Sequence, residues 1–242
     1  MAGRSAELFV FCCLLIGAVY LSIPIEARAE ANDDPLLTLV FVDELEYRDA
    51  DNGSLQAWSA QGWLGKDLRK LWIKTEGQRS GGSTEDAELQ FLYSKSVGRY
   101  WDFQTGVRQD FEPSPSRTWV AIGFQGLSPY FFEIDTALFI GESGRTALRL
   151  EAGYDLLFTQ RLILTPDIEV NLYGKDDPDI GIGSGLSNLQ AGLRLRYEIR
   201  REFAPYIGLN WSKMFGDTAD FAAAAGESAA DLQLTIGLRA WF

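Results

Sequence analysis

Apolar and polar residues alternate along most of this chain, and no other feature restricts its fold as strongly. The final segment carries apolar side chains at every second position: Leu232, Leu234, Ile236, Leu238, Ala240 and Phe242. The same pattern recurs over residues 146–158, 162–173 and 189–199. Successive side chains of a strand point to opposite faces, so each segment has one apolar and one polar face. A helix would scatter Arg194, Arg196 and Glu198 around its circumference.

These segments predict an all-β fold, namely a transmembrane antiparallel up-and-down β-barrel. The alternative is a soluble β-sandwich with its apolar face inward, but sandwich strands most often have about 5–6 residues. An outer-membrane barrel needs longer strands that present apolar side chains to lipid and polar side chains to the lumen. Alternation and turn residues together indicate about twelve strands, near residues 36–48, 54–65, 69–78, 85–96, 99–111, 117–127, 129–141, 145–158, 161–173, 186–199, 202–213 and 231–242.

Short and long connections are expected to alternate between these strands, as is typical of outer-membrane barrels. The short connections lie near Gly65–Lys66, Gly98, Ser128, Gln160 and Arg200–Arg201. The longer ones contain residues 51–53, 80–83, 113–115, 141–144, 174–185 and 215–230. An even number of strands would place both chain ends on the periplasmic side. Aromatic residues near strand ends are expected to form interfacial girdles: Tyr100, Trp101, Tyr130, Phe131, Phe132, Trp211, Trp241 and Phe242.

The N-terminus predicts export across the inner membrane. An apolar run from Leu8 to Ile25 is followed by the cleavage signal Ala27-Arg28-Ala29, so residues 1–29 are interpreted as a signal peptide. Residues 30–35 would form a short periplasmic segment, and residues 36–242 the barrel in the outer membrane of a Gram-negative cell. A membrane-anchoring helix is the alternative, which Pro24 and the short run disfavour. Cleavage would remove both cysteines and exclude disulfides from the mature chain.

Charge and the C-terminus indicate the expected partners. The formal net charge of −12 excludes nucleic acid as a partner, because nucleic-acid binding needs a basic surface. Outer-membrane lipid and lipopolysaccharide are expected around the barrel. The terminal Phe242, which follows apolar residues at every second position, is similar to the C-terminal signal read by the bacterial barrel assembly machinery.

The polar faces supply the candidate functional residues of the lumen. Divalent cations could be passed or transiently held by carboxylates, with these candidates: Glu133, Asp135, Glu151, Asp155, Asp167 and Glu169. The basic candidates are Arg108, Arg149, Arg194, Arg196 and Arg239. Further charges predicted to face the lumen are Glu44, Glu46, Lys74, Glu76, Glu88, Asp102, Asp110 and Glu198. We favour mutual pairing across a narrow lumen over a metal site, since buried charge is costly unless paired.

Three aspartates in one connection suggest a calcium loop, but the spacing fails. Asp176, Asp177 and Asp179 have the local pattern, whereas Asn188 stands where the final glutamate of such a loop should be. A solvated loop, or one bridged by cations to lipopolysaccharide, is the preferred interpretation.

Several blocks of the chain resemble the copper resistance protein B family. They are Trp72–Gly77, Arg79–Gly82, Glu85–Gln90, Tyr100–Asp102, Gly106–Asp110, Pro115–Trp119, Gly141–Ala147, Asn171–Lys175, Gly181–Leu186 and Tyr197–Tyr206. The resemblance extends over essentially all of the mature chain, and the blocks are specific in combination. It implies an outer-membrane component of copper resistance that acts with periplasmic copper-handling proteins.

The chain departs from that family in its copper ligands. Many members carry a Met- and His-rich segment before the barrel, whereas this chain has no histidine and only Met1 and Met214. Thioether and imidazole groups are the ligands that select copper ions. We therefore expect no tightly bound cofactor, with copper as a transported or transient ligand. The sequence has no nucleophile motif, so we expect no enzyme. A small-solute channel without a copper role remains the alternative.

Overall fold

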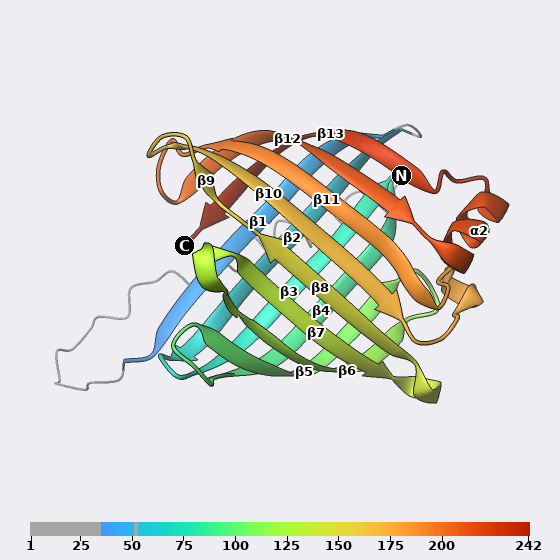
Figure 1. The fold of residues 1–242 in the computed structure, drawn as a ribbon, viewed down its shortest axis with the longest axis horizontal. Coiled ribbons are helices and arrows are strands. Elements are labelled where there is room, and N and C mark those ends of the chain that lie inside the picture. The colour runs from blue at the N-terminus through green and yellow to red at the C-terminus, as the bar shows by residue number, and fades with distance from the viewer. Residues whose placement is uncertain (1–34, 51–52) are drawn as a thin grey trace, which may run out of the picture.

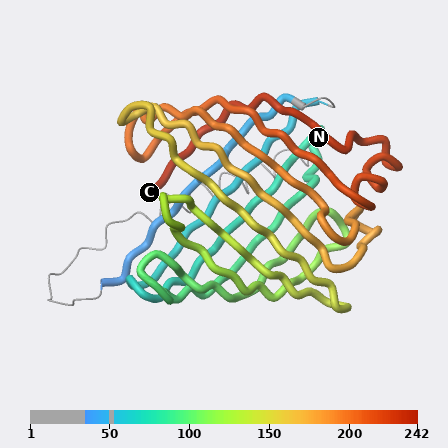
Figure 2. The backbone as a smooth tube through the Cα atoms, viewed as in Figure 1, coloured from blue at the N-terminus to red at the C-terminus, as the bar shows by residue number. Residues whose placement is uncertain are grey.

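The strands form one closed antiparallel barrel. The computed structural model describes residues 35–50 and 53–242, and its chain winds around the barrel in sequence order (Figures 1 and 2). The strands are β1 Leu37–Ala50, β2 Gly53–Lys66, β3 Arg69–Ser80, β4 Ser83–Ser96, β5 Trp101–Glu112, β6 Arg117–Leu127, β7 Glu133–Gly141, β8 Thr146–Gly153, β9 Leu156–Leu157, β10 Leu162–Tyr173, β11 Gly185–Tyr197, β12 Phe203–Met214 and β13 Ala230–Trp241. Strand β1 pairs with β13 and closes the wall.

Twelve wall positions result from these thirteen segments, because β8 and β9 occupy one position. Both pair with β10, β8 along residues 167–173 and β9 along residues 163–164. The predicted twelve-stranded antiparallel barrel is therefore confirmed. We call the end that carries Leu37 and Trp241 the terminal rim, and the opposite end the loop rim.

The walls are apolar outside and polar inside, as the alternation predicts. On β13, Leu232, Leu234 and Ile236 are 60%, 55% and 60% exposed, whereas Gln233 and Thr235 between them are 7% and 0% exposed. A soluble sandwich would bury the leucines instead. This arrangement is the one that a barrel in lipid requires, and it excludes the sandwich.

Two connections that were predicted to be long are short. The segments at residues 51–53 and 80–83 were expected to be long, but β2 starts at Gly53 directly after the two residues that follow β1, and Gly81–Gly82 alone joins β3 to β4. Both glycines have positive φ, 58° and 93°. A tight two-residue turn requires this conformation, and glycine adopts it more easily than other residues do. The loop rim is therefore low beside β2, β3 and β4.

Two predicted strands are shorter than expected. Strand β7 begins at Glu133 and not at residue 129, because the 3-10 turn η1 (Pro129–Phe131) precedes it. Tyr130 and Phe131 in that turn have φ of 68° and 66°, which extended backbone excludes. The predicted strand 145–158 is interrupted between β8 and β9.

One helix lies in the connection at residues 215–230, which was predicted to be long. Helix α2 (Gly216–Ala225) occupies the connection between β12 and β13 at the loop rim (Figure 1). Its alanine-rich sequence favours a helix, and Gly226 ends it with the left-handed conformation of a C-terminal cap. Shorter 3-10 turns η2 (Glu142–Gly144) and η3 (Pro178–Ile180) lie at the same rim. The described part of the chain has no helix with the length and hydropathy needed to cross a membrane.

The predicted aromatic residues lie at the surface of the wall. Tyr100, Tyr130, Phe131 and Phe242 at the terminal rim are 58%, 83%, 77% and 63% exposed. Phe242 also belongs to the wall, since its backbone exchanges two hydrogen bonds with Val40 of β1. The signal peptide and nearly all of the segment 30–35 fall outside the described residues, so those assignments stay predictions.

Candidate functional site

A cavity of about 1220 Å³ occupies the lumen. Its lining extends from Asp43 and Arg239 near the terminal rim to Arg117 and Phe221 at the loop rim. Among the described residues, fourteen acidic and eight basic side chains line it. The lumen is thus a continuous polar interior with an excess of negative charge.

Strand register arranges six of these carboxylates in two rows. The first acidic row runs across β3, β4 and β5 and consists of Glu76, Glu88 and Asp110, each directly opposite the next. The second acidic row runs across β7, β8 and β10 and consists of Asp135, Glu151 and Glu169. Like charges directly opposite each other on neighbouring strands destabilise a sheet. The rows therefore require cations between them.

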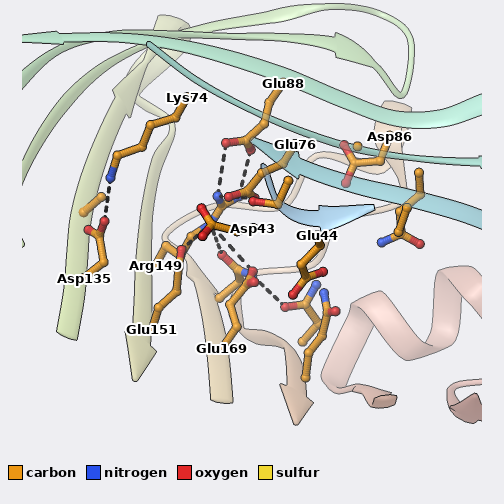
Figure 3. Close-up of a pocket in the computed structure, with 18 of the residues that line it drawn as sticks. Asp43, Glu44, Lys74, Glu76, Asp86, Glu88, Asp135, Arg149, Glu151 and Glu169 are labelled. Atoms are coloured by element: carbon orange, nitrogen blue, oxygen red, sulfur yellow. Dashed lines mark hydrogen bonds and ion pairs between the residues drawn. The ribbon is translucent and has the colours of Figure 1, made fainter. Parts of the chain in front are cut away.

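Arg149 lies between the two rows and contacts both (Figure 3). Its Nη1 and Nη2 donate to Glu88 Oε1 and Oε2 at 3.1 and 2.8 Å, and Nη1 also donates to Glu76 Oε2 at 3.3 Å. On the other side its Nε lies 3.6 Å from Glu169. The side chains of Arg149 and Glu88 are only 10% and 5% exposed. Arg149 is the main connection between opposite walls of the barrel.

Arg108 strengthens this centre from the side of the first row. Its Nη2 lies 2.7 Å from Glu88 Oε2, and its Nε donates to Asp110 Oδ1 at 2.6 Å. The guanidinium groups of Arg108 and Arg149 lie 4.6 and 5.8 Å from the ring centroid of Phe139. An aromatic face attracts such cations, so Phe139 fixes both arginines in place.

A second charged cluster surrounds Arg194. Its Nε donates to Glu46 Oε1 at 2.6 Å, its Nη2 lies 2.7 Å from Glu44, and its Nη1 donates to Asp167. Gly192 makes this geometry possible, because a Cβ at that position would overlap both the Arg194 guanidinium and the Asp167 carboxylate.

The structure thus pairs each predicted basic residue with a carboxylate. Arg196 Nη2 donates to Asp155 Oδ2 at 2.5 Å, and Arg239 lies 3.3 Å from Asp43. Glu133 lines the cavity near the terminal rim. No group of three or more ligating side chains suited to holding a metal ion occurs within residues 35–50 and 53–242. A metal-binding role for the six candidate carboxylates stays a prediction.

Asp43 is a lumen residue that strict alternation misses. The register of β1 shifts between Val42 and Glu44, and this β-bulge lets both Asp43 and Glu44 line the cavity. Arg48, paired with Glu44 at 3.1 Å and with Glu46 at 2.6 Å, was also not among the candidates. Arg48 follows Glu44 and Glu46 at every second position of β1, so alternation alone could have indicated it. The sequence carries no signal for the bulge that brings Asp43 into the lumen.

The aspartates of the β10–β11 connection bind arginines and backbone. Asp177 accepts hydrogen bonds from Arg117 Nε and Nη2 at 2.8 and 2.9 Å, and Arg145 Nε lies 2.8 Å away. The hydrogen bonds from Arg117 lower the pKa of Asp177 below its ordinary value. Asp176 accepts the backbone N–H of Ser184 at 2.6 Å, and its pKa is also lowered by its contacts with Ser184. These contacts tie the connection to β6 and to the start of β8.

Fold and lumen together define an outer-membrane β-barrel with a charged interior. A solved structure titled "NanC porin structure in rhombohedral crystal form" has the same fold, with a TM-score of 0.55 and 10% sequence identity over 84% of this chain and 99% of that one. At that identity the likeness concerns the fold alone.

The sequence comparisons identify the family. The family model described as "Copper resistance protein B precursor (CopB)" matches residues 36–242. Copper resistance protein B of Escherichia coli is 48% identical over 87% of this chain and 71% of its own length. The copper resistance protein B homolog of Pseudomonas syringae pv. tomato is 46% identical over 93% of this chain and 76% of its own length. The chain belongs to the copper resistance protein B family, as the sequence blocks predicted.

Proposed function

We propose that this barrel contributes to copper resistance by passing copper ions, as hydrated cations, through its acidic lumen. The observation that carries the proposal is the excess of fourteen acidic over eight basic lining residues. Charge of one sign in a cleft with low-dielectric walls concentrates the counter-ion. Cu²⁺ also forms stronger complexes with a given ligand set than other first-row divalent ions do. Export of periplasmic copper, or its sequestration at the outer membrane, would follow from such transient binding.

Transient binding fits the ligands better than a resident copper site does. The carboxylates of the two acidic rows already contact arginine or lysine, and hard oxygen ligands select copper poorly. The single methionine among the described residues, Met214, lines the cavity near the loop rim. A partner that supplies soft ligands, such as a periplasmic copper-handling protein, would deliver or receive the ion. This division of labour requires no catalytic step in the barrel.

Export and assembly complete the proposal. Cleavage after Ala29 would release the chain into the periplasm, the barrel assembly machinery would recognise Phe242, and the terminal rim would face the periplasm. The loop rim would then face lipopolysaccharide, where Asp179, 68% exposed in its side chain and only loosely paired with Arg117 at 3.6 Å, could bind bridging cations.

The test is copper tolerance of a deletion strain complemented with variants of this gene. We compare wild type, a Glu151→Gln/Glu169→Gln double variant and the control Glu142→Gln, whose residue is exposed in η2 at the loop rim. Wild type and control should restore growth in copper, and the double variant should restore it less at equal amounts of folded barrel on a heat-modifiability gel. Full rescue by the double variant would overturn the role of the second acidic row.

A small-solute channel without a copper role is the second candidate, favoured by the cavity of about 1220 Å³. Swelling of proteoliposomes in neutral sugars separates the two functions. Rapid sugar entry, combined with unchanged copper tolerance of the deletion strain, would favour the channel. Slow sugar entry with copper sensitivity favours the proposed copper passage.

A further inference from the structure

Lys74 differs from the other cations of the lumen. It is the only lysine among the described cavity-lining residues, and the other seven basic residues are arginines. Lys74 Nζ donates to Asp135 Oδ2 at 2.6 Å and lies 5.8 Å from the ring centroid of Trp72. An ammonium group on a flexible stem lacks the rigid fork by which arginine engages carboxylates. Arg149 and Arg194, by contrast, each contact at least three carboxylates.

The ion pair between Lys74 and Asp135 crosses the lumen. Strands β4, β5 and β6 separate β3 from β7 in the wall, and Figure 3 shows the lysine extending from its own strand to the aspartate on another. The two side chains are 12% and 21% exposed. This contact therefore joins walls that share no backbone hydrogen bond, and both residues line the cavity through which an ion would move.

Asp135 is also the end of the second acidic row. Glu151 stands directly opposite it on β8, followed by Glu169 on β10. Arg149 contacts Glu151 and Glu169 at 4.0 and 3.6 Å, so the row has a fixed cation at one end and the lysine at the other. The ammonium of Lys74 occupies the position beside Asp135 that a cation on this row would otherwise take.

We propose that Lys74 is a tethered counter-ion that restricts the passage of cations through the lumen by occupying Asp135. We call this ion pair the latch. A passing cation competes with the ammonium for Asp135, and the lumen widens beside Asp135 when the lysine side chain swings away. Arg108 and Arg149 remain in place, because Glu88 and the Phe139 ring hold them. The inference rests on the proposed passage of cations, and it adds the residue that limits both the rate and the charge selectivity of that passage.

The test measures single-channel conductance and reversal potential in planar lipid bilayers, under a gradient of potassium chloride. Lys74→Met removes the charge and keeps the length of the side chain, and Lys74→Arg keeps the charge. Lys70→Met is the matched control, because Lys70 lies on the same strand, pairs with Asp102 at 3.4 Å and is not among the cavity-lining residues. All variants are first checked for folding by heat modifiability.

The expected result is a higher conductance for Lys74→Met and a reversal potential shifted closer to the equilibrium potential of K⁺. Lys74→Arg should conduct no more than wild type, and Lys70→Met should match it. A cation-selective wild type with unchanged conductance in Lys74→Met would overturn the latch while leaving cation passage intact. A wild type without cation selectivity would instead overturn the proposed function. A similar gain in Lys70→Met would show that any loss of positive charge suffices, and would also overturn the latch.

Discussion

Replacing Arg149 with methionine removes the cation that connects the two acidic rows. Three hydrogen bonds to Glu88 and Glu76 would be lost, and hydrogen bonds to charged groups contribute roughly 1.5–3 kcal/mol each. Glu88 would keep Arg108 as a partner at 2.7 Å, which limits the loss. Removing one partner of a buried ion pair costs about 3–5 kcal/mol. We expect the free energy of unfolding to fall by about 3 kcal/mol, at the lower end of that range.

Equilibrium unfolding in urea, followed by tryptophan fluorescence of the barrel in phospholipid bilayers, measures this change. The control is Arg201→Met, because Arg201 is 73% exposed and lies 3.5 Å from Glu198. An ion pair whose arginine is this exposed should contribute less than about 1 kcal/mol, although Glu198 itself is only 13% exposed. Adding Glu88→Gln to Arg149→Met should recover part of the stability, since it removes a carboxylate that has lost its main partner. An Arg149→Met barrel as stable as the control variant would refute this account of the lumen.

Three further predictions concern the lumen, the loop rim and copper. Gly192→Ala should lower the free energy of unfolding by about 1–3 kcal/mol through overpacking, whereas Gly153→Ala should be nearly neutral because its Cβ would meet no atom closer than 4.0 Å. Folding lowers the pKa of Asp177 below its ordinary value of 3.8. The stability that its ionised carboxylate contributes is therefore present above pH 3.8 and is lost as pH falls through the lower folded-state pKa. Pepsin should then cut residues 174–184 faster below that pKa, and Asp177→Asn should expose them to proteases already at neutral pH. Calorimetric titration of the refolded barrel should detect only weak Cu²⁺ binding and no Cu⁺ site, and a sub-micromolar Cu⁺ site that survives Met214→Leu would contradict the ligand argument.

Local patterns predicted the strands well because a barrel wall is built from one repeated local rule. Lipid outside and water inside impose a period of two on every strand, so β6 was predicted with its observed bounds, Arg117–Leu127. Alternation fails where the backbone departs from a regular extended strand. The bulge beside Asp43 and the left-handed Tyr130 and Phe131 change the face or the bounds of a strand without a signal in hydropathy.

The arrangement of the lumen charges depended on information that a single strand does not hold. Alternation placed Glu76, Glu88, Asp135 and Glu151 inside, but whether they stand opposite one another is set by register between strands. Contacts across the barrel depend in addition on its diameter and shear. Arg149 was therefore a predicted lumen residue, while its position between two acidic rows was not predictable from the sequence.

If the loop rim faces the cell exterior, as proposed, its uneven height determines which part of the molecule is accessible from outside the cell. In the proposed orientation, the two-residue turn Gly81–Gly82 leaves the β3–β4 sector level with the wall, whereas α2 and the β10–β11 connection rise on the other side. The sugar chains of neighbouring lipopolysaccharide would overhang the low sector. Antibodies or bacteriophages that approach an intact cell would consequently meet α2 and residues 174–184. Exposed positions such as Asp179 can change there under such selection without disturbing the ion pairs of Arg149 and Arg194, whereas Asp177 is constrained by its pairing with Arg117.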